Sequence, residues 1–90
     1  MEVEGFETFG EASSGGGYNW RVFGVWLKDG EFWWASDAGC SCYYQWYDSN
    51  FPADFEGHGT AHDAIKALMD WKDSAAEAEP LLNRLLGYRE

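Results

Sequence analysis

The sequence predicts an α+β domain in which a small antiparallel sheet, built on a β-hairpin at about residues 19–36, is packed by two helices. An Asp-Gly pair at positions 29 and 30 separates two runs rich in β-branched and aromatic residues, and apolar residues recur at helical spacing after position 60. We expect a long helix at about 60–78 and a short C-terminal helix at about 80–87. Because no linker or repeat divides the chain, residues 1–90 are expected to form a single domain.

The hairpin is predicted by its turn. Asp-Gly between two β-rich runs favours a two-residue turn, because glycine tolerates the positive φ that such turns require. This turn would place Lys28 opposite Glu31 and Trp26 opposite Trp33, with successive pairs on opposite faces of the sheet. The face expected to be the core side is wholly apolar and holds Phe23, Val25, Leu27, Phe32 and Trp34. The face with Trp26 and Trp33 is expected to be half exposed, or covered by a later part of the chain.

The segment before the hairpin gives a weaker pattern. Residues 1–11 alternate loosely between polar and apolar, which predicts a short strand. Residues 11–17, EASSGGG, are predicted to be a mobile loop, since their small side chains bury too little surface to offset the entropy lost on ordering. A phosphate-binding loop is excluded, because no Lys followed by Ser or Thr ends the glycine run.

The helical part begins at Thr60, a favourable N-cap, with Asp63 three residues later in the position of a capping box. Because proline lacks the N–H that a helix interior needs, Pro80 predicts that the long helix ends just before it. Ser74 with Glu77 forms an alternative capping box that would place the break at residues 73–74. Pro80, six residues beyond that cap, argues against the alternative.

The excess of acidic residues limits which classes of molecule the protein can bind. Asp and Glu outnumber Lys and Arg by 16 to 6, and seven acids but no Lys or Arg lie between Lys28 and Lys66. Direct nucleic-acid binding is therefore not expected, because its affinity comes from cationic side chains. The acidic N-terminus does not resemble a signal peptide, and no apolar run approaches the roughly 18 residues that span a bilayer. We expect a cytoplasmic protein with no membrane association, whose open sheet edge could pair in a homo-oligomer.

Residues 37–59 are expected to be a long loop that faces a partner, with a third short strand at residues 43–47. Aromatic and acidic side chains alternate there, a composition suited to holding Arg or Lys by ion pairing and cation–π contact. The sequence therefore predicts that the chain binds a protein partner, with a basic surface, through this loop and through the paired tryptophans of the hairpin. The predicted partner-binding residues are Tyr43, Tyr44, Trp46, Tyr47, Asp48, Phe51, Asp54, Glu56, Trp26 and Trp33.

The same stretch contains both cysteines and both histidines. Cys40, Cys42, His58 and His62 could supply the two sulfurs and two imidazoles of a tetrahedral zinc site, although the Cys-x-Cys spacing is unusual. The competing interpretation is two free thiols and two unrelated histidines, with no cofactor. A cysteine nucleophile is not favoured, because neighbouring acids raise the pKa of a thiol. An EF-hand is excluded, since Phe51 and Pro52 occupy positions where a ligand and a glycine belong.

The motifs SDAGCSC at residues 36–42 and DFEGHGTAHDAIKALMDW at residues 54–71 resemble small uncharacterised proteins of actinobacterial phages and their hosts. The resemblance covers about residues 20–71 and rests on a D-x-G-C-S-C turn and a G-T-opened helix. It implies a phage accessory protein acting on a host protein in the host cytoplasm, and it implies no activity. We therefore expect a non-enzymatic binding protein. The alternatives are a zinc-stabilised Cys2His2 module and a DNA-mimic inhibitor.

Overall fold

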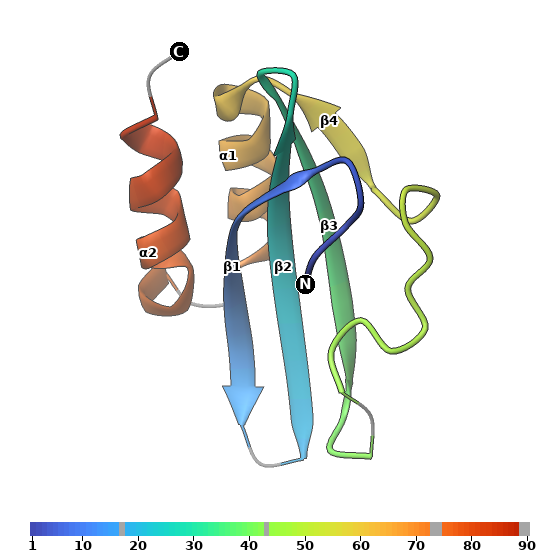
Figure 1. Cartoon of the computed structure of the whole chain (residues 1–90). Coiled ribbons are helices and arrows are strands. Elements are labelled where there is room, and N and C mark those ends of the chain that lie inside the picture. The colour runs from blue at the N-terminus through green and yellow to red at the C-terminus, as the bar shows by residue number, and fades with distance from the viewer. Residues whose placement is uncertain (17, 43, 73–74, 89–90) are drawn as a thin grey trace.

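The computed structural model describes residues 1–16, 18–42, 44–72 and 75–88. Its fold is α+β, as predicted: a four-stranded antiparallel sheet followed by two helices that pack against it (Figure 1). The strands are β1 (Glu7–Gly16), β2 (Asn19–Lys28), β3 (Glu31–Cys40) and β4 (Gly57–Gly59), in the order β1-β2-β3-β4. The helices are α1 (Ala61–Trp71) and α2 (Ala75–Leu86).

The predicted hairpin and its register are confirmed. Lys28 pairs with Glu31 and Trp26 with Trp33, and the turn residue Asp29 has a φ of 52°. Gly30, with a φ of 78°, also takes the left-handed conformation that a two-residue turn of this type requires. β2 begins at Asn19, as predicted, whereas β3 extends beyond the predicted range to Cys40.

The prediction of a mobile loop at residues 11–17 is wrong for the part that the structure describes. Residues 11–16 belong to β1 and pair with β2, with Ser13 opposite Val22 and Gly15 opposite Trp20. Gly15 has a φ of 94°, and a Cβ on it would lie 2.5 Å from the carbonyl oxygen of Asn19. Backbone pairing with a long neighbouring strand therefore orders a segment whose own side chains bury little surface.

Two predictions about the later elements are also wrong. The capping box of Thr60 and Asp63 is confirmed, but α1 ends at Trp71, and α2 continues through Pro80 to Leu86. Pro80 is the sixth residue of α2, where proline removes one helical hydrogen bond, and the burial of Ala78, Leu81 and Leu85 against the rest of the core stabilises the helix despite this loss. Residues 73–74, where the alternative break was placed, lie outside the described residues. Residues 44–47 form no strand, since residues 45–48 are in turns, and β4 at residues 57–59 completes the sheet.

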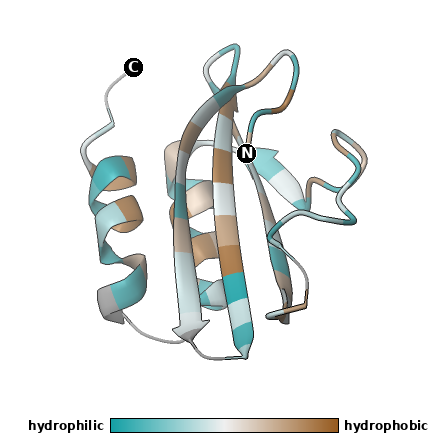
Figure 2. Ribbon diagram, turned by 60° about the horizontal axis from the view of Figure 1, so that its bottom comes forward, coloured by the Kyte–Doolittle hydropathy of each residue, from teal (hydrophilic) through white to brown (hydrophobic). Residues whose placement is uncertain are grey.

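The sheet has a hydrophobic core on each of its faces. Between the sheet and the helices lie Phe23, Val25, Phe32 and Leu68, all at most 1% exposed. Figure 2 shows that α2 turns its hydrophobic side toward the sheet and its hydrophilic side away from it. The second core, on the opposite face, holds Val3, Val22, Trp26, Ala35 and Trp46. This second core needs a cover other than a helix, and the loop after β3 supplies it.

Candidate acidic-aromatic binding groove

The loop after β3, described at residues 41–42 and 44–56, leads to β4 and packs on the sheet face that the helices do not cover (Figure 1). Backbone hydrogen bonds between residues three apart form turns within the loop: Tyr47 N–H donates to the Tyr44 carbonyl, and Ser49 N–H donates to the Trp46 carbonyl. At its end, Glu56 N–H donates to the carbonyl of Trp34 at 2.8 Å, which joins the loop to the β3 edge. The loop is thus folded onto the sheet.

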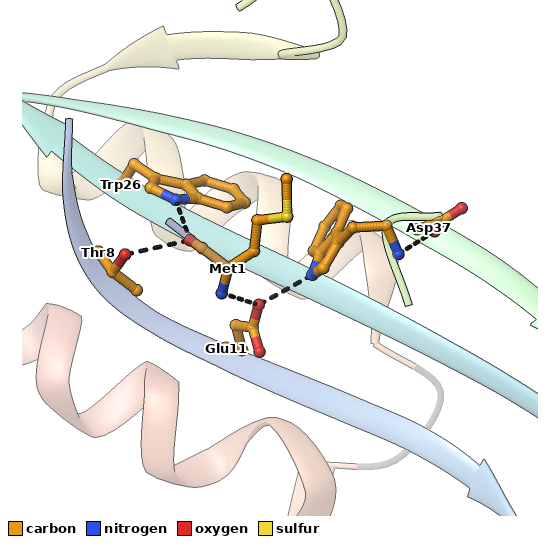
Figure 3. A network of polar contacts seen from close by, with 6 residues as sticks. Met1, Thr8, Glu11, Trp26 and Asp37 are labelled. Atoms are coloured by element: carbon orange, nitrogen blue, oxygen red, sulfur yellow. Dashed lines mark hydrogen bonds and ion pairs between the residues drawn. The ribbon is translucent and has the colours of Figure 1, made fainter. Parts of the chain in front are cut away.

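Trp46 anchors this loop. Its side chain is only 6% exposed and lies edge-on to Trp26, with ring centroids 5.6 Å apart. Its backbone N–H donates to Asp37 Oδ2 at 2.7 Å, and its indole Nε1–H donates to Glu11 Oε2 at 2.9 Å; Figure 3 labels these two acidic residues. Its φ of 68° is rare for a residue with a side chain, so these contacts offset a local conformational cost. Three strands therefore hold one loop residue.

The structure corrects the expectation that Trp26 contacts a partner. Trp26 is fully buried beneath Trp46, Phe51 and Phe55, and its Nε1–H donates to the Met1 carbonyl at 2.9 Å (Figure 3). Its ring belongs to the second core, where loop aromatics cover it. The paired Trp33 is half-buried and stacks on His58, with centroids 4.3 Å apart.

The other predicted partner-binding residues fall into two groups. Trp46 and Phe51 pack into the second core, Trp46 almost completely and Phe51 in part. Tyr44 and Tyr47 are 73% and 56% exposed, and their rings pack edge-on with centroids 5.2 Å apart. The exposed side chains on the loop also include the acids Asp48, Asp54 and Glu56. Tyr43 lies outside the described residues.

The exposed side chains border two neighbouring pockets between β3 and the loop. One has a volume of about 290 Å³ and is lined by Trp20, Cys40, Tyr44 and Tyr47, among others. The second has a volume of about 300 Å³ and includes Asp54 and Glu56 in its lining. Asp37 and Asp48 line both pockets, so the two adjoin, and we call the pair of pockets the acidic groove. Among the residues that the structure describes, no lysine or arginine lines it.

Most carboxylates of the acidic groove are held in place by the backbone. Glu56 Oε2 accepts from both the N–H and the hydroxyl of Ser36, at 2.7 and 2.6 Å. Asp54 Oδ2 accepts from Asn50 N–H at 2.6 Å, and Asp37 accepts from Trp46 and Ala38 N–H groups. Asp48 has no hydrogen-bond or ion-pair partner within the described part of the chain. The groove therefore presents fixed negative charges together with one carboxylate that is free to bind.

The four residues of the predicted zinc site do not come together. His58 lies opposite Trp33, whereas Cys40 is seven residues further along β3, roughly 20 Å away at about 3.3 Å per residue. His62 is exposed on the first turn of α1, and His58 Nδ1 lies 2.9 Å from Glu31 Oε2. Across residues 1–16, 18–42, 44–72 and 75–88, no three His, Cys, Asp or Glu residues are grouped to hold a metal ion. The Cys2His2 prediction is therefore wrong.

The two cysteines nevertheless lie together as free thiols, with 3.0 Å between Cys40 Sγ and Cys42 Sγ. Hydrogen bonding between the two thiols lowers the pKa of Cys40, because it stabilises the Cys40 thiolate. The same hydrogen bond and the neighbouring charge raise the pKa of Cys42. The expectation that both thiols have raised pKa values therefore fails for Cys40.

Two residues of this site could not be found from the sequence. Glu11 was assigned to a mobile loop, and nothing in its neighbourhood indicates that it accepts the indole N–H of Trp46. Asp37 stands before the Gly-Cys-Ser-Cys motif, but its role as acceptor for Trp46 depends on a contact nine residues away in the chain. Both roles follow from the tertiary fold.

A family model described as a domain of unknown function (DUF7574) matches residues 2–85. Comparison with curated proteins and with solved structures gives no match. Neither helix of the described structure is long and apolar enough to cross a membrane.

Proposed function

Because the chain belongs to the DUF7574 family, whose description names no activity, we propose a function from the groove itself: it binds a basic segment of a partner protein. The observation that carries the proposal is the joining of two pockets by Asp37 and Asp48, with exposed tyrosines on one rim and further acids on the other. The resemblance to phage-encoded proteins makes host proteins the first candidates for that partner.

Electrostatics supports a cationic ligand. The groove has four carboxylates and no lining lysine or arginine among the described residues, so the formal charges of its lining are all negative. Such a concave surface concentrates positive charge and raises the association rate of a basic partner. Since Asp48 has no partner in the described structure, a bound guanidinium or ammonium group would pair with it without breaking an existing contact.

The aromatic rim supports arginine or lysine over a simple metal cation. Tyr44 and Tyr47 expose their rings beside Asp48, and an arginine side chain can stack on a tyrosine while its charge meets a carboxylate. Tyrosine is also enriched in protein interfaces, because it contributes a large contact area with little conformational entropy to lose. An extended segment with two or more basic residues would fill both pockets.

Reversing the charge of Asp48 tests this proposal. We expect Asp48→Lys to weaken binding of an arginine-rich peptide by about tenfold or more at low salt, because it removes the unpaired carboxylate and adds a repulsive charge. Isothermal titration calorimetry measures the change. The matched control is Asp70→Lys, which makes the same change in net charge on the exposed side of α1.

The control distinguishes groove binding from general attraction to an acidic protein. The proposal predicts that Asp70→Lys changes the dissociation constant by less than about twofold, since a charge on the helical side is screened from the groove. Equal losses in the two variants would show that net charge alone governs binding, and the proposal would then be abandoned. Tyr44→Ala should weaken binding by about threefold, through the lost cation–π contact.

A further inference from the structure

The Cys40–Cys42 pair lies at the end of β3, in a segment whose backbone is held on both sides. Trp20 Nε1–H donates to the Cys40 carbonyl at 2.8 Å, and Ser41 N–H donates to the Tyr18 carbonyl at 2.7 Å. Cys42 is exposed and Cys40 is half-buried. The two sulfurs are therefore presented together by a fixed turn, in contact with each other and accessible from solvent.

The two thiols differ in chemical character. Cys40 lines the pocket of about 290 Å³ and Cys42 does not, and hydrogen bonding between the two thiols lowers the pKa of Cys40, so Cys40 is the thiol that ionises first. Cys42 retains its proton to a higher pH and lies 3.0 Å from the Cys40 sulfur. This is the arrangement of an attacking thiol with a second, resolving thiol beside it.

A ligand-sized space adjoins the nucleophile. Cys40 lines the pocket of about 290 Å³ together with Tyr44, Tyr47, Asp37 and Asp48. A substituent attached to the sulfur under attack could occupy this pocket. Because two carboxylates line it, a positively charged substituent is favoured over a negatively charged one.

We propose that Cys40 and Cys42 are a redox-active dithiol that reduces a disulfide flanked by positively charged groups. The Cys40 thiolate attacks one sulfur of that disulfide, whose S–S bond breaks and releases the other sulfur as a thiolate. Cys42 then loses its proton to water and attacks Cys40 Sγ, which forms the Cys40–Cys42 bond and releases the second thiol. The two protein thiols are oxidised to a disulfide, and the ligand disulfide is reduced to two thiols.

Intact-mass measurement after reaction with cystamine, a disulfide with two ammonium groups, tests the two-step course. The wild-type protein is expected to lose two hydrogens and to retain no adduct. The Cys42→Ser variant should retain one cystamine-derived adduct on Cys40, and Cys40→Ser should react at least about tenfold more slowly than wild type. Two stable adducts on each wild-type chain, with no internal disulfide, would overturn the proposal.

Rate measurements test the assigned roles. Relative to an unstructured Gly-Cys-Ser-Cys peptide, the protein should react faster with cystamine than with anionic glutathione disulfide, and Asp48→Asn should reduce that preference. The rate of Cys40 alkylation should rise at a lower pH than that of the peptide, and Cys42→Ala, which removes the hydrogen-bonding side chain, should move this rise to higher pH. Rates equal to those of the peptide with both reagents would contradict the proposal. Cys42→Ser, at a position that lines neither pocket of the acidic groove, should still bind a basic peptide, so failure of this proposal and failure of the proposed function are distinguishable.

Discussion

Replacing Trp26 with alanine is expected to lower the free energy of unfolding by about 3 to 5 kcal/mol, the cost of removing a large ring from a packed core. Trp26 is fully buried and contacts three aromatic rings of the loop, Trp46, Phe51 and Phe55. Its loss would leave a cavity and remove the hydrogen bond to the Met1 carbonyl. Urea unfolding followed by circular dichroism measures the change.

The matched control is Tyr18→Ala, since Tyr18 is an aromatic residue that is 81% exposed. That variant should change stability by no more than about 0.5 kcal/mol. If Trp26→Ala does not fold, Trp26→Phe provides the measurement with a smaller cavity, and it should still be clearly less stable than wild type. A loss below about 1 kcal/mol in Trp26→Ala would show that the second core contributes little, contrary to its burial in the structure.

Replacing Trp46 with alanine is expected to cost about 3 kcal/mol and to release the loop from the sheet. Trp46 connects the loop to β1 through Glu11, to β2 through Trp26 and to β3 through Asp37. Without the indole, residues 44–56 should become the first site of limited proteolysis, and their amide hydrogens should exchange faster than those of β2.

The control for this prediction is the neighbouring Gln45→Ala, because Gln45 is exposed and belongs to the same turn. It should leave both the proteolysis pattern and the stability near those of wild type. If Trp46→Ala is cleaved no faster in the loop than Gln45→Ala, Trp46 is not the anchor. Because Trp46 is buried, its replacement tests whether the loop that forms the groove is held on the sheet. Replacement of the exposed Tyr44 or Asp48 tests whether the groove binds a ligand.

The sequence was most informative where local chemistry determines the backbone. The Asp-Gly turn fixed the register of β2 and β3, because two residues with positive φ permit one close pairing of the flanking strands. The Thr60 cap was equally predictable, since its partner Asp63 is three residues away. In both cases the interacting residues are close in the chain, so their pattern can be read directly.

The incorrect predictions concern long-range contacts. The glycine-rich part of β1 is ordered by pairing with β2, which its own composition does not indicate. The continuation of α2 through Pro80 follows from packing of Leu81 and Leu85. For the groove, composition predicted an acidic and aromatic loop, but only the fold shows that Trp46 is buried while Tyr44 and Tyr47 are exposed.

The central claim, that the acidic groove binds a basic protein segment, is tested most directly by nuclear magnetic resonance. Isotope-labelled protein would be titrated with an arginine-rich peptide while the backbone amide signals are followed. Saturable shifts at Ser36, Asp37, Tyr44, Tyr47 and Asp48, with α1 and α2 unaffected, are the predicted result. Shifts centred on the helices, or spread evenly over the acidic residues of the whole surface, would contradict it.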